Sequence, residues 1–319
     1  MNKKKEALAG WLFLAPALVV FLALVIIPII MSFLLSFADW NFLSGLGGLK
    51  WCGLDNFEKL FTVDRKFIMA LTNTLLYAVI TAPVSILIAL ILAYLLNNKV
   101  YFKKFNRMCF FIPYISSMVA LTAVFRFLFR SDGPINAILM QIFHITEVPN
   151  WLTSTELSKV PITCVIIYAG VGFSLIVYMA ALQNVPQELY EAATIDGANG
   201  FVQFFKITFP LISPTTFYLC IVRLIAAFKI FTAINVMGMA DTAPSLVSEV
   251  YSNAFVSYDF GYASAESWVL VAIILIVTLI AGLIAAGVAL YKNWDKVKEK
   301  LSELWGNIKE KFNAIKETI

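Results

Sequence analysis

Between two long apolar runs, residues 185–214 read VPQELYEAATIDGANGFVQFFKITFPLISP. Asn184 precedes this segment and can cap a helix, and Pro186 suits the first helical turn. Glu188 and Glu191 then lie near the positive end of the helix dipole, where carboxylates are stabilising. These residues predict a short helix directly after the preceding apolar run.

Two alanines and a glycine occupy the middle of the segment. Ala192 and Ala193 give the predicted helix a face of small residues, and Gly197 permits a left-handed break after it. A second short helix is expected over residues 199–207, ending before Pro210. A face of alanines lets the backbone of another protein approach closely. The segment is therefore either a docking site or a simple interfacial connector between two spans.

The rest of the chain is unusually apolar. Of its 319 residues, 61% are hydrophobic and 14% are charged, whereas a soluble domain has roughly 25% charged residues. A spanning helix needs about 20 mainly apolar residues. We therefore predict an all-α membrane protein with six transmembrane helices, at residues 8–37, 67–96, 108–128, 160–182, 211–237 and 268–291. Pro214 fits the first turn of the fifth, and no acidic residue lies inside any of the six.

Basic residues in the loops indicate the orientation, because Lys and Arg concentrate on the cytosolic side. The segments on the side of the N-terminus hold Lys3, Lys4, Lys5, Lys99, Lys103, Lys104, Arg107, Lys206 and a lysine-rich tail. The segments on the other side are mixed in charge. The last of them, residues 238–266, has four acidic residues and no Lys or Arg. This bias predicts both termini in the cytosol (N-in, C-in) and places residues 185–214 there too.

The cytosolic segment resembles the EAA loop of binding-protein-dependent ABC importers, in the form of the carbohydrate (maltose and glycerol-phosphate type) subgroup. The matching residues are Glu191-Ala192-Ala193, Asp196-Gly197-Ala198, Ile207 and Phe209-Pro210. The family usually has Leu in place of Phe209. Shorter matches at residues 11–16, 53–57, 73–74, 111–114 and 259–264 extend the resemblance over residues 8–280. Residues 237–244 depart from the glycine-rich stretch that the family has after the fifth span.

The resemblance implies a type I ABC importer permease fold and a role as the transmembrane permease subunit of an ATP-driven importer of a sugar or oligosaccharide. It implies an inner (cell) membrane location of bacterial type, with a second permease subunit, two ATP-binding subunits, an extracytoplasmic sugar-binding protein and membrane lipid as partners. ATP and Mg would be bound by the partner subunits, since this chain has no G-x-x-x-x-G-K-[ST] motif. The residues expected to couple this chain to the ATPase are Glu188, Glu191, Ala192, Ala193, Asp196, Gly197 and Ala198.

Two basic residues, Arg223 and Lys229, fall within the predicted fifth span. A charge at the centre of a spanning helix costs roughly 2.5–3.5 kcal/mol on insertion scales, so both are expected to face protein or water. One hypothesis is that they line the substrate path and bind sugar hydroxyls or an acidic group. The other is that they form an ion pair within this chain or with a partner subunit.

The end of the chain differs from the rest. Residues 292–319 predict a cytoplasmic amphipathic helix, because apolar residues recur at spacings of three and four. The expected organisation is a six-span permease domain over residues 1–291 and this tail over residues 292–319. The tail also resembles lysine- and tryptophan-rich segments of phage tail tape-measure proteins.

Other classes of protein remain as alternatives. One is a secondary transporter or channel that works without ATP. Such a protein is expected to have an internal repeat, or an acidic residue inside a span that couples transport to protons or sodium ions. Another, indicated by the tail alone, is a phage structural or membrane-anchoring protein. An enzyme is not indicated, and neither is nucleic-acid binding. The four cysteines are far apart and His144 has no partner at metal-ligand spacing, so we expect no catalytic or metal site.

Overall fold

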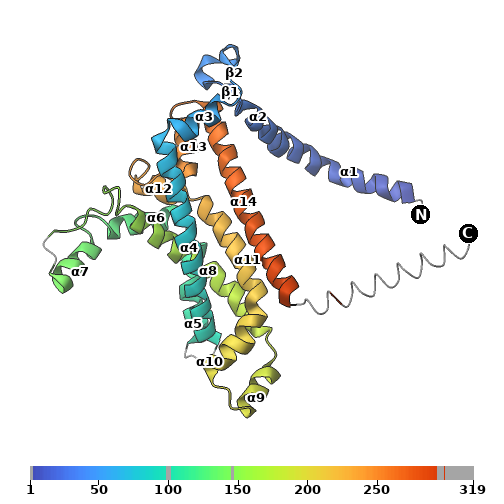
Figure 1. Cartoon of the computed structure of the whole chain (residues 1–319), viewed down its shortest axis with the longest axis vertical. Helices are drawn as coiled ribbons and strands as arrows, with labels where there is room; N and C mark the ends of the chain where they lie inside the picture. Colours follow the sequence, from blue (N-terminus) through green and yellow to red (C-terminus); the bar gives the residue numbers. More distant parts are fainter. Residues whose placement is uncertain (1–2, 98–101, 145–146, 293–297, 299–319) are drawn as a thin grey trace, which may run out of the picture. The chain divides into compact units, whose positions relative to one another are not determined.

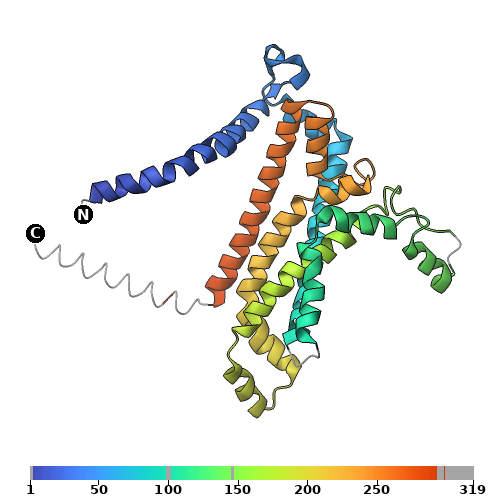
Figure 2. The same ribbon diagram turned by 180° about the vertical axis from the view of Figure 1, so that it is seen from behind.

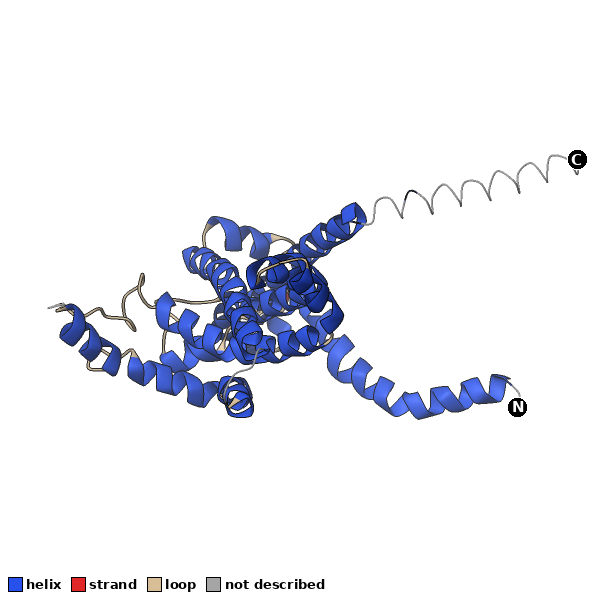
Figure 3. Cartoon of the chain, turned by 90° about the horizontal axis from the view of Figure 1, so that it is seen from below, coloured by secondary structure: helices blue, strands red, loops and turns tan. Residues whose placement is uncertain are grey.

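The computed structural model describes residues 3–97, 102–144, 147–292 and 298. Helices make up nearly all of the regular structure (Figure 3), so the prediction of an all-α protein is confirmed. In the described part, β1 (Ala38–Asp39) and β2 (Lys50–Trp51) pair antiparallel, with Ala38 opposite Trp51. The chain divides into two compact units, residues 1–272 and 273–319. The predicted tail helix lies, apart from Lys292 and Lys298, outside the described residues.

Short helical turns separate several of the longer helices. In chain order the helical elements are α1 (Lys3–Phe21), the π-turn η1 (Leu22–Ile26), α2 (Ile27–Leu35), the 3-10 turns η2 (Phe42–Ser44) and η3 (Leu46–Gly48), α3 (Asp55–Thr62), α4 (Arg65–Asn97), α5 (Lys103–Ile115), α6 (Met118–Leu128), α7 (Pro134–Phe143), α8 (Lys159–Gln183), α9 (Gln187–Ile195), α10 (Gly200–Gln203), the π-turn η4 (Phe204–Thr208), α11 (Phe209–Phe228), α12 (Thr232–Met237), α13 (Leu246–Phe255) and α14 (Phe260–Lys292).

All six predicted spans have a helical counterpart. In the described part, five segments are long and apolar enough to cross a membrane: Gly10–Leu35, Arg65–Asn97, Lys159–Gln183, Gly200–Phe228 and Phe260–Ile284. The pair formed by Lys104–Ile115 and Met118–Leu128 is a sixth if it counts as one broken span.

The predicted third span is not straight, because its two halves are bent by 97°. The break lies at Ser116, whose extended backbone (ψ 153°) ends α5, and Ser117 then precedes α6. Pro113 in the last turn of α5 cannot donate a backbone hydrogen bond, which weakens the helix there. The predicted third span, residues 108–128, is therefore a broken helix.

Helices α4, α8 and α11 pack side by side and form the core of the first unit (Figures 1 and 2). On α4, Ala82, Ala89 and Ala93 are buried, and small residues let helix backbones approach closely in a membrane. Tyr178 of α8 is fully buried and donates its hydroxyl hydrogen to Thr216 Oγ1 of α11 at 3.1 Å. Packing of small residues and this internal hydrogen bond hold the three helices together.

The boundaries around the fifth span differ from the prediction. Asn184 ends α8 and does not cap α9, which Pro186 precedes without a side-chain hydrogen bond. The second short helix does not stop before Pro210 but continues through η4 into α11. Pro210 is therefore the second residue of α11 within this continuous helical segment, and Pro214 lies farther inside the helix.

The C-terminal end of the fifth span and the start of the sixth also differ from the prediction. Helix α11 ends at Phe228, so Lys229 is a capping residue beyond the helix and not part of the span. Helix α14 begins at Phe260, earlier than predicted, and thereby includes Glu266. The expectation of no acidic residue within a span was wrong at this position. Glu266 is fully buried, and its Oε2 accepts a hydrogen bond from Asn253 Nδ2 at 3.0 Å.

The loop before α13 is hydrogen-bonded to α4. Thr74 Oγ1 accepts from the backbone N–H of Leu246 at 2.9 Å, and Asn73 Nδ2 donates to the carbonyl of Pro244 at 3.1 Å. Tyr77 donates its hydroxyl hydrogen to the carbonyl of Ala243 at 3.2 Å. Three side chains of one helix face thus satisfy buried backbone groups of a loop that is distant in sequence.

Candidate functional site

The coupling residues predicted from the sequence lie on α9 and on the turn after it, at the end of the first unit opposite the β1–β2 hairpin (Figure 1). Most of them are exposed: Glu188, Glu191, Ala192, Asp196 and Gly197. Ala193 and Ala198 are half-buried. We call residues 185–208 the connector.

A left-handed glycine shapes the connector. Gly197 has a φ of +78°, a conformation that residues with a Cβ rarely adopt. The N–H of Ala198 bonds to the carbonyl of Ala193 at 2.8 Å, which closes the end of α9. Asn199 then caps α10 by accepting from the N–H of Val202 at 2.9 Å. The predicted break at Gly197 is confirmed.

Side-chain hydrogen bonds fix α9 to the start of the fifth span. The hydroxyl groups of Tyr190 and Thr208 are 2.8 Å apart, and Thr208 is fully buried in η4. Gln203 Nε2 donates to Thr194 Oγ1 at 3.0 Å and to the carbonyl of Ala198 at 3.1 Å. Because α10, η4 and α11 follow one another without a gap, α9 is hydrogen-bonded through Tyr190 to the continuous helical segment that includes the fifth span.

The connector also exposes large apolar side chains that were not among the predicted site residues. Ile195 is 87% exposed, Phe201 is 74% exposed and Leu189 is 42% exposed. Apolar side chains in a polar segment at the end of the helices are typical of a surface that another protein covers. In the sequence, this apolar surface was indicated by two large apolar residues, Ile195 and Phe201, on either side of Gly197.

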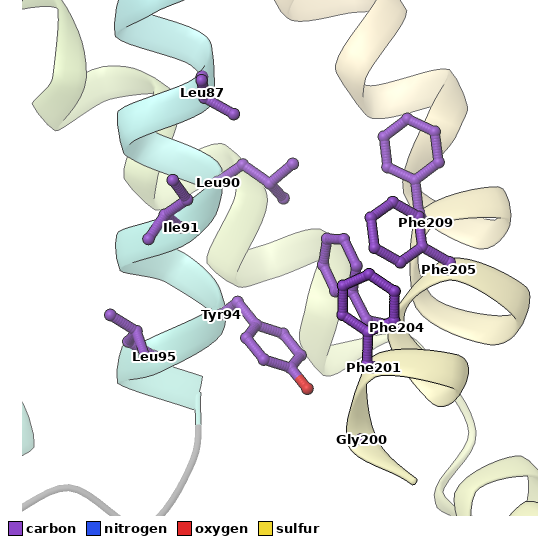
Figure 4. A pocket seen from close by; sticks show the side chains of 10 residues that line it. All are labelled: Leu87, Leu90, Ile91, Tyr94, Leu95, Gly200, Phe201, Phe204, Phe205 and Phe209. Atoms are coloured by element: carbon purple, nitrogen blue, oxygen red, sulfur yellow. The ribbon is translucent and has the colours of Figure 1, made fainter. Parts of the chain in front are cut away.

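A cavity of about 530 Å³ lies between α4 and the connector (Figure 4). Aliphatic side chains and Tyr94 of α4 line one wall, and four phenylalanines line the other: Phe201, Phe204, Phe205 and Phe209. The rings of Tyr94 and Phe204 meet edge to face, with centroids 5.0 Å apart. Because the lining is almost wholly apolar, this cavity lacks the polar groups that a sugar requires.

Arg223 lies where α4, α8 and α11 converge. Its Nε donates to Ser85 Oγ of α4 at 3.4 Å, and none of the ion pairs among the described residues includes it. The hypothesis of an ion pair within the chain is therefore not supported for the described part. An unpaired charge is costly in a membrane. The guanidinium of Arg223 therefore needs water, an anion or a group of a partner subunit to stabilise its charge.

Lys229 is exposed at the end of α11 and likewise takes part in none of the ion pairs of the described residues. The structure does not place it against Arg223. Within the same described residues, no group of three or more His, Cys, Asp or Glu side chains is arranged to hold a metal ion.

A bundle of membrane-crossing helices with an exposed helical connector at one end defines a multi-span membrane protein. The chain belongs to the family of binding-protein-dependent transport system inner membrane components, whose model matches residues 85–290. It is thus a permease subunit of an ABC importer and not itself an enzyme. Membership excludes the alternatives of an ATP-independent transporter and a phage structural protein.

Relatives and a solved structure agree with this assignment. The chain is 33% identical to the lactose transport system permease protein LacF of Rhizobium radiobacter over 85% of this chain and 92% of that protein. It is 32% identical to the arabinooligosaccharides transport system permease protein AraP of Bacillus subtilis (strain 168), over 86% of this chain and 87% of that one. It is similar to a chain of a bacterial alginate ABC transporter solved with an alginate pentasaccharide-bound periplasmic protein, with a TM-score of 0.72, 26% identity and coverage of 87% and 93%. The type I importer permease fold is confirmed.

Proposed function

We propose that this permease moves a saccharide across the inner membrane and that the connector couples this movement to ATP hydrolysis. The substrate class is supported by the relatives, which are named for the transport of lactose, arabinooligosaccharides and alginate. In this proposal an extracytoplasmic binding protein delivers the saccharide. A second permease completes the pathway, and two ATP-binding subunits hold ATP and Mg.

The observation that supports coupling is the exposed apolar face of a rigid connector. Ile195 and Leu189 would enter a groove of an ATP-binding subunit, while the small Ala192 lets the two backbones approach. Glu188, Glu191 and Asp196 would surround this contact with charge, and the bend at Gly197 sets the direction of the two short helices. Movement of the ATP-binding subunits would then pull α11 through η4.

The proposed substrate path passes Arg223. Arg223 is half-buried, lies against Ser85 of α4 and Gly170 of α8, and takes part in none of the ion pairs of the described residues. Water or a saccharide would therefore satisfy its free N–H groups. Lys229, which is exposed at the outer end of α11, is the second basic group proposed for this path.

Reconstitution of the complete transporter with its binding protein tests the proposal. The informative variant is Ile195→Asp, because a residue that is 87% exposed can be changed without disturbing the fold. We expect it to abolish association with the ATP-binding subunits and saccharide uptake. The matched control is Leu46→Asp, since Leu46 is 84% exposed but lies in the hairpin region at the other end.

Normal uptake and normal association by Ile195→Asp would contradict the proposed role of the connector. Absence of saccharide uptake by the unaltered transporter, with ATP hydrolysis that the loaded binding protein does not stimulate, would contradict the proposed substrate class.

A further inference from the structure

A second, polar cavity lies at the C-terminal end of α6 and shares no lining residue with the cavity beside the connector. Its volume is about 490 Å³, and it is formed by the end of α6, the loops on either side of α7 and Val236 of α12. The polar side chains that line it are Arg126, Arg130, Ser131, Asn150, Trp151 and Thr153. By the orientation predicted from the loop charges, this cavity opens on the outer side of the membrane.

One buried side chain holds the walls of this cavity in place. Asn136 is fully buried, and its Nδ2 donates to the carbonyls of Ser131 at 3.1 Å and Pro149 at 3.2 Å. Its Oδ1 accepts from Trp151 Nε1 at 2.7 Å, which fixes the indole ring. Phe129 packs edge-on against the same ring, with centroids 5.7 Å apart. Through Asn136, the loops before and after α7 are hydrogen-bonded to each other, so the cavity between them is preformed.

The charge of the lining is strongly asymmetric, since it contains two arginines and no acidic residue. Arg126 donates from Nη1 to the carbonyl of Val236 at 3.0 Å, which orients the guanidinium and leaves its other N–H groups for a ligand. Arg130 makes two parallel contacts with Asp132, which is 69% exposed: Nε lies 3.0 Å from Oδ1, and Nη2 donates to Oδ2 at 3.1 Å. A carboxylate in the cavity would find one oriented guanidinium, that of Arg126. It would bind the second guanidinium, that of Arg130, through the remaining N–H groups or in place of the exposed Asp132 carboxylate.

We propose that this outer cavity binds a carboxylated saccharide, with Arg126 and Arg130 holding the carboxylate and Trp151 lying beside the sugar ring. This inference rests on the proposed saccharide transport and specifies the substrate as acidic. A guanidinium matches the planar carboxylate with two parallel hydrogen bonds. Ser131, Asn150 and Thr153 supply neutral donors and acceptors of the kind that sugar hydroxyls need.

A carboxylate could instead come from the surface of the binding protein. The observations favour a small molecule, because the cavity is concave, has the volume of a small-ligand site and contains a fixed aromatic ring. A docked protein would instead be expected to contact a broad, flat surface and not a concave cavity. Docking of the binding protein is therefore the competing outcome of the test.

The test measures saccharide binding to the complete transporter in nanodiscs, without the binding protein, by saturation-transfer NMR. The probes are trisaccharides of glucuronate, galacturonate, mannuronate and guluronate, each compared with its carboxyl-reduced counterpart. We expect at least one carboxylated probe to bind about tenfold more tightly than its reduced form. Arg130→Gln should weaken that preference, and the double change with Arg126→Gln should remove it.

The matched control is Arg65→Gln, an exposed arginine outside this cavity, which should retain the preference. Arg130 is itself 55% exposed, so its single variant reports on binding without a large effect on folding. An unaltered transporter that prefers none of the carboxylated probes would overturn the proposal. So would variants that keep the preference but bind the binding protein less tightly, because that result assigns the arginines to docking. Stimulation of ATP hydrolysis by the loaded binding protein, measured in parallel, reports on the proposed function independently.

Discussion

The guanidinium of Arg223 on α11 occupies the space that a side chain at position 170 on α8 would fill. A Cβ atom on Gly170 would overlap Nη2 and Cζ of Arg223. Ser85 of α4 accepts the hydrogen bond from Nε on the third side, at 3.4 Å. Arg223 can therefore occupy its position between the three helices only because residue 170 is a glycine.

The first prediction concerns this contact. Gly170→Ala should displace the guanidinium of Arg223, because a long side chain moves more easily than two packed helices. If Arg223 lines the substrate path, uptake should fall about tenfold, equivalent to about 1.4 kcal/mol, and as far as in Arg223→Gln. The double variant should be no worse than either single one, since both remove the same group.

Gly10→Ala serves as the control, because a Cβ at Gly10 meets no atom within 4 Å. Full uptake by Gly170→Ala, with reduced uptake by Arg223→Gln, would show that the arginine acts from another position.

The second prediction concerns the loop that α4 holds. Thr74→Val removes the acceptor of the buried Leu246 N–H while keeping the shape of the side chain. An unpaired buried donor costs about 1–3 kcal/mol, so the purified protein should unfold at a lower temperature. Thr72→Val is the control, because Thr72 is exposed and bonds only to the carbonyl of Ile68 in its own helix. Equal melting temperatures for the two variants would contradict this account.

The third prediction concerns Glu249, which is 4% exposed and lies 3.0 Å from the ammonium of Lys66. Burial raises the pKa of the Glu249 carboxyl above its usual value, and Lys66 opposes this effect. Lys66→Gln should leave a buried carboxylate without its cation and destabilise the fold by about 1–3 kcal/mol near pH 8. A folded-state pKa above the unfolded value means that stability is lost as the pH rises, so the loss should shrink near about pH 5.

Adding Glu249→Gln to Lys66→Gln should restore much of the stability at the higher pH. Thermal unfolding across this pH range is the measurement, and Lys50→Gln on the exposed strand β2 is the control. A loss that is independent of pH would show that Lys66 stabilises the fold by packing and not by charge.

The fourth prediction concerns the link between α9 and the fifth span. Tyr190→Phe removes the hydroxyl that lies 2.8 Å from Thr208 Oγ1. A neutral hydrogen bond contributes about 0.5–1.5 kcal/mol, so we expect a severalfold loss of uptake per ATP hydrolysed, with normal association of the ATP-binding subunits. Tyr218→Phe, at an exposed residue of α11, should leave this ratio unchanged. Equal ratios in both variants would exclude a coupling role for the bond.

Much of the fold was predictable because the bilayer demands long apolar helices. The six spans, the break at Gly197 and the family resemblance all followed from local patterns of residues. The bend at Ser116 did not, because serine is common in membrane helices and only packing decides whether a helix ends there. The start of α14 was also missed, since a charge is costly inside a span and only the structure shows the hydrogen bond from Asn253 that Glu266 accepts.

The candidate site was predictable only in part. The coupling residues stood in a recognisable motif, whereas the exposure of Ile195 and Phe201 depended on how the two short helices turn. The cavity around Trp151 joins α6 to loops that are separated by α7. No local pattern indicates that Asn136 would bring these segments together.

We expect the connector to face the cytosol and to be held there by an ATP-binding subunit. The direct measurement is labelling of Ile195→Cys with a membrane-impermeant maleimide, after Cys52, Cys109, Cys164 and Cys220 are replaced by serine. Leu46→Cys marks the opposite side. We predict labelling of Ile195→Cys only in permeabilised cells, and protection once the ATP-binding subunits are present. Labelling in intact cells, or equal labelling with and without those subunits, would contradict the account.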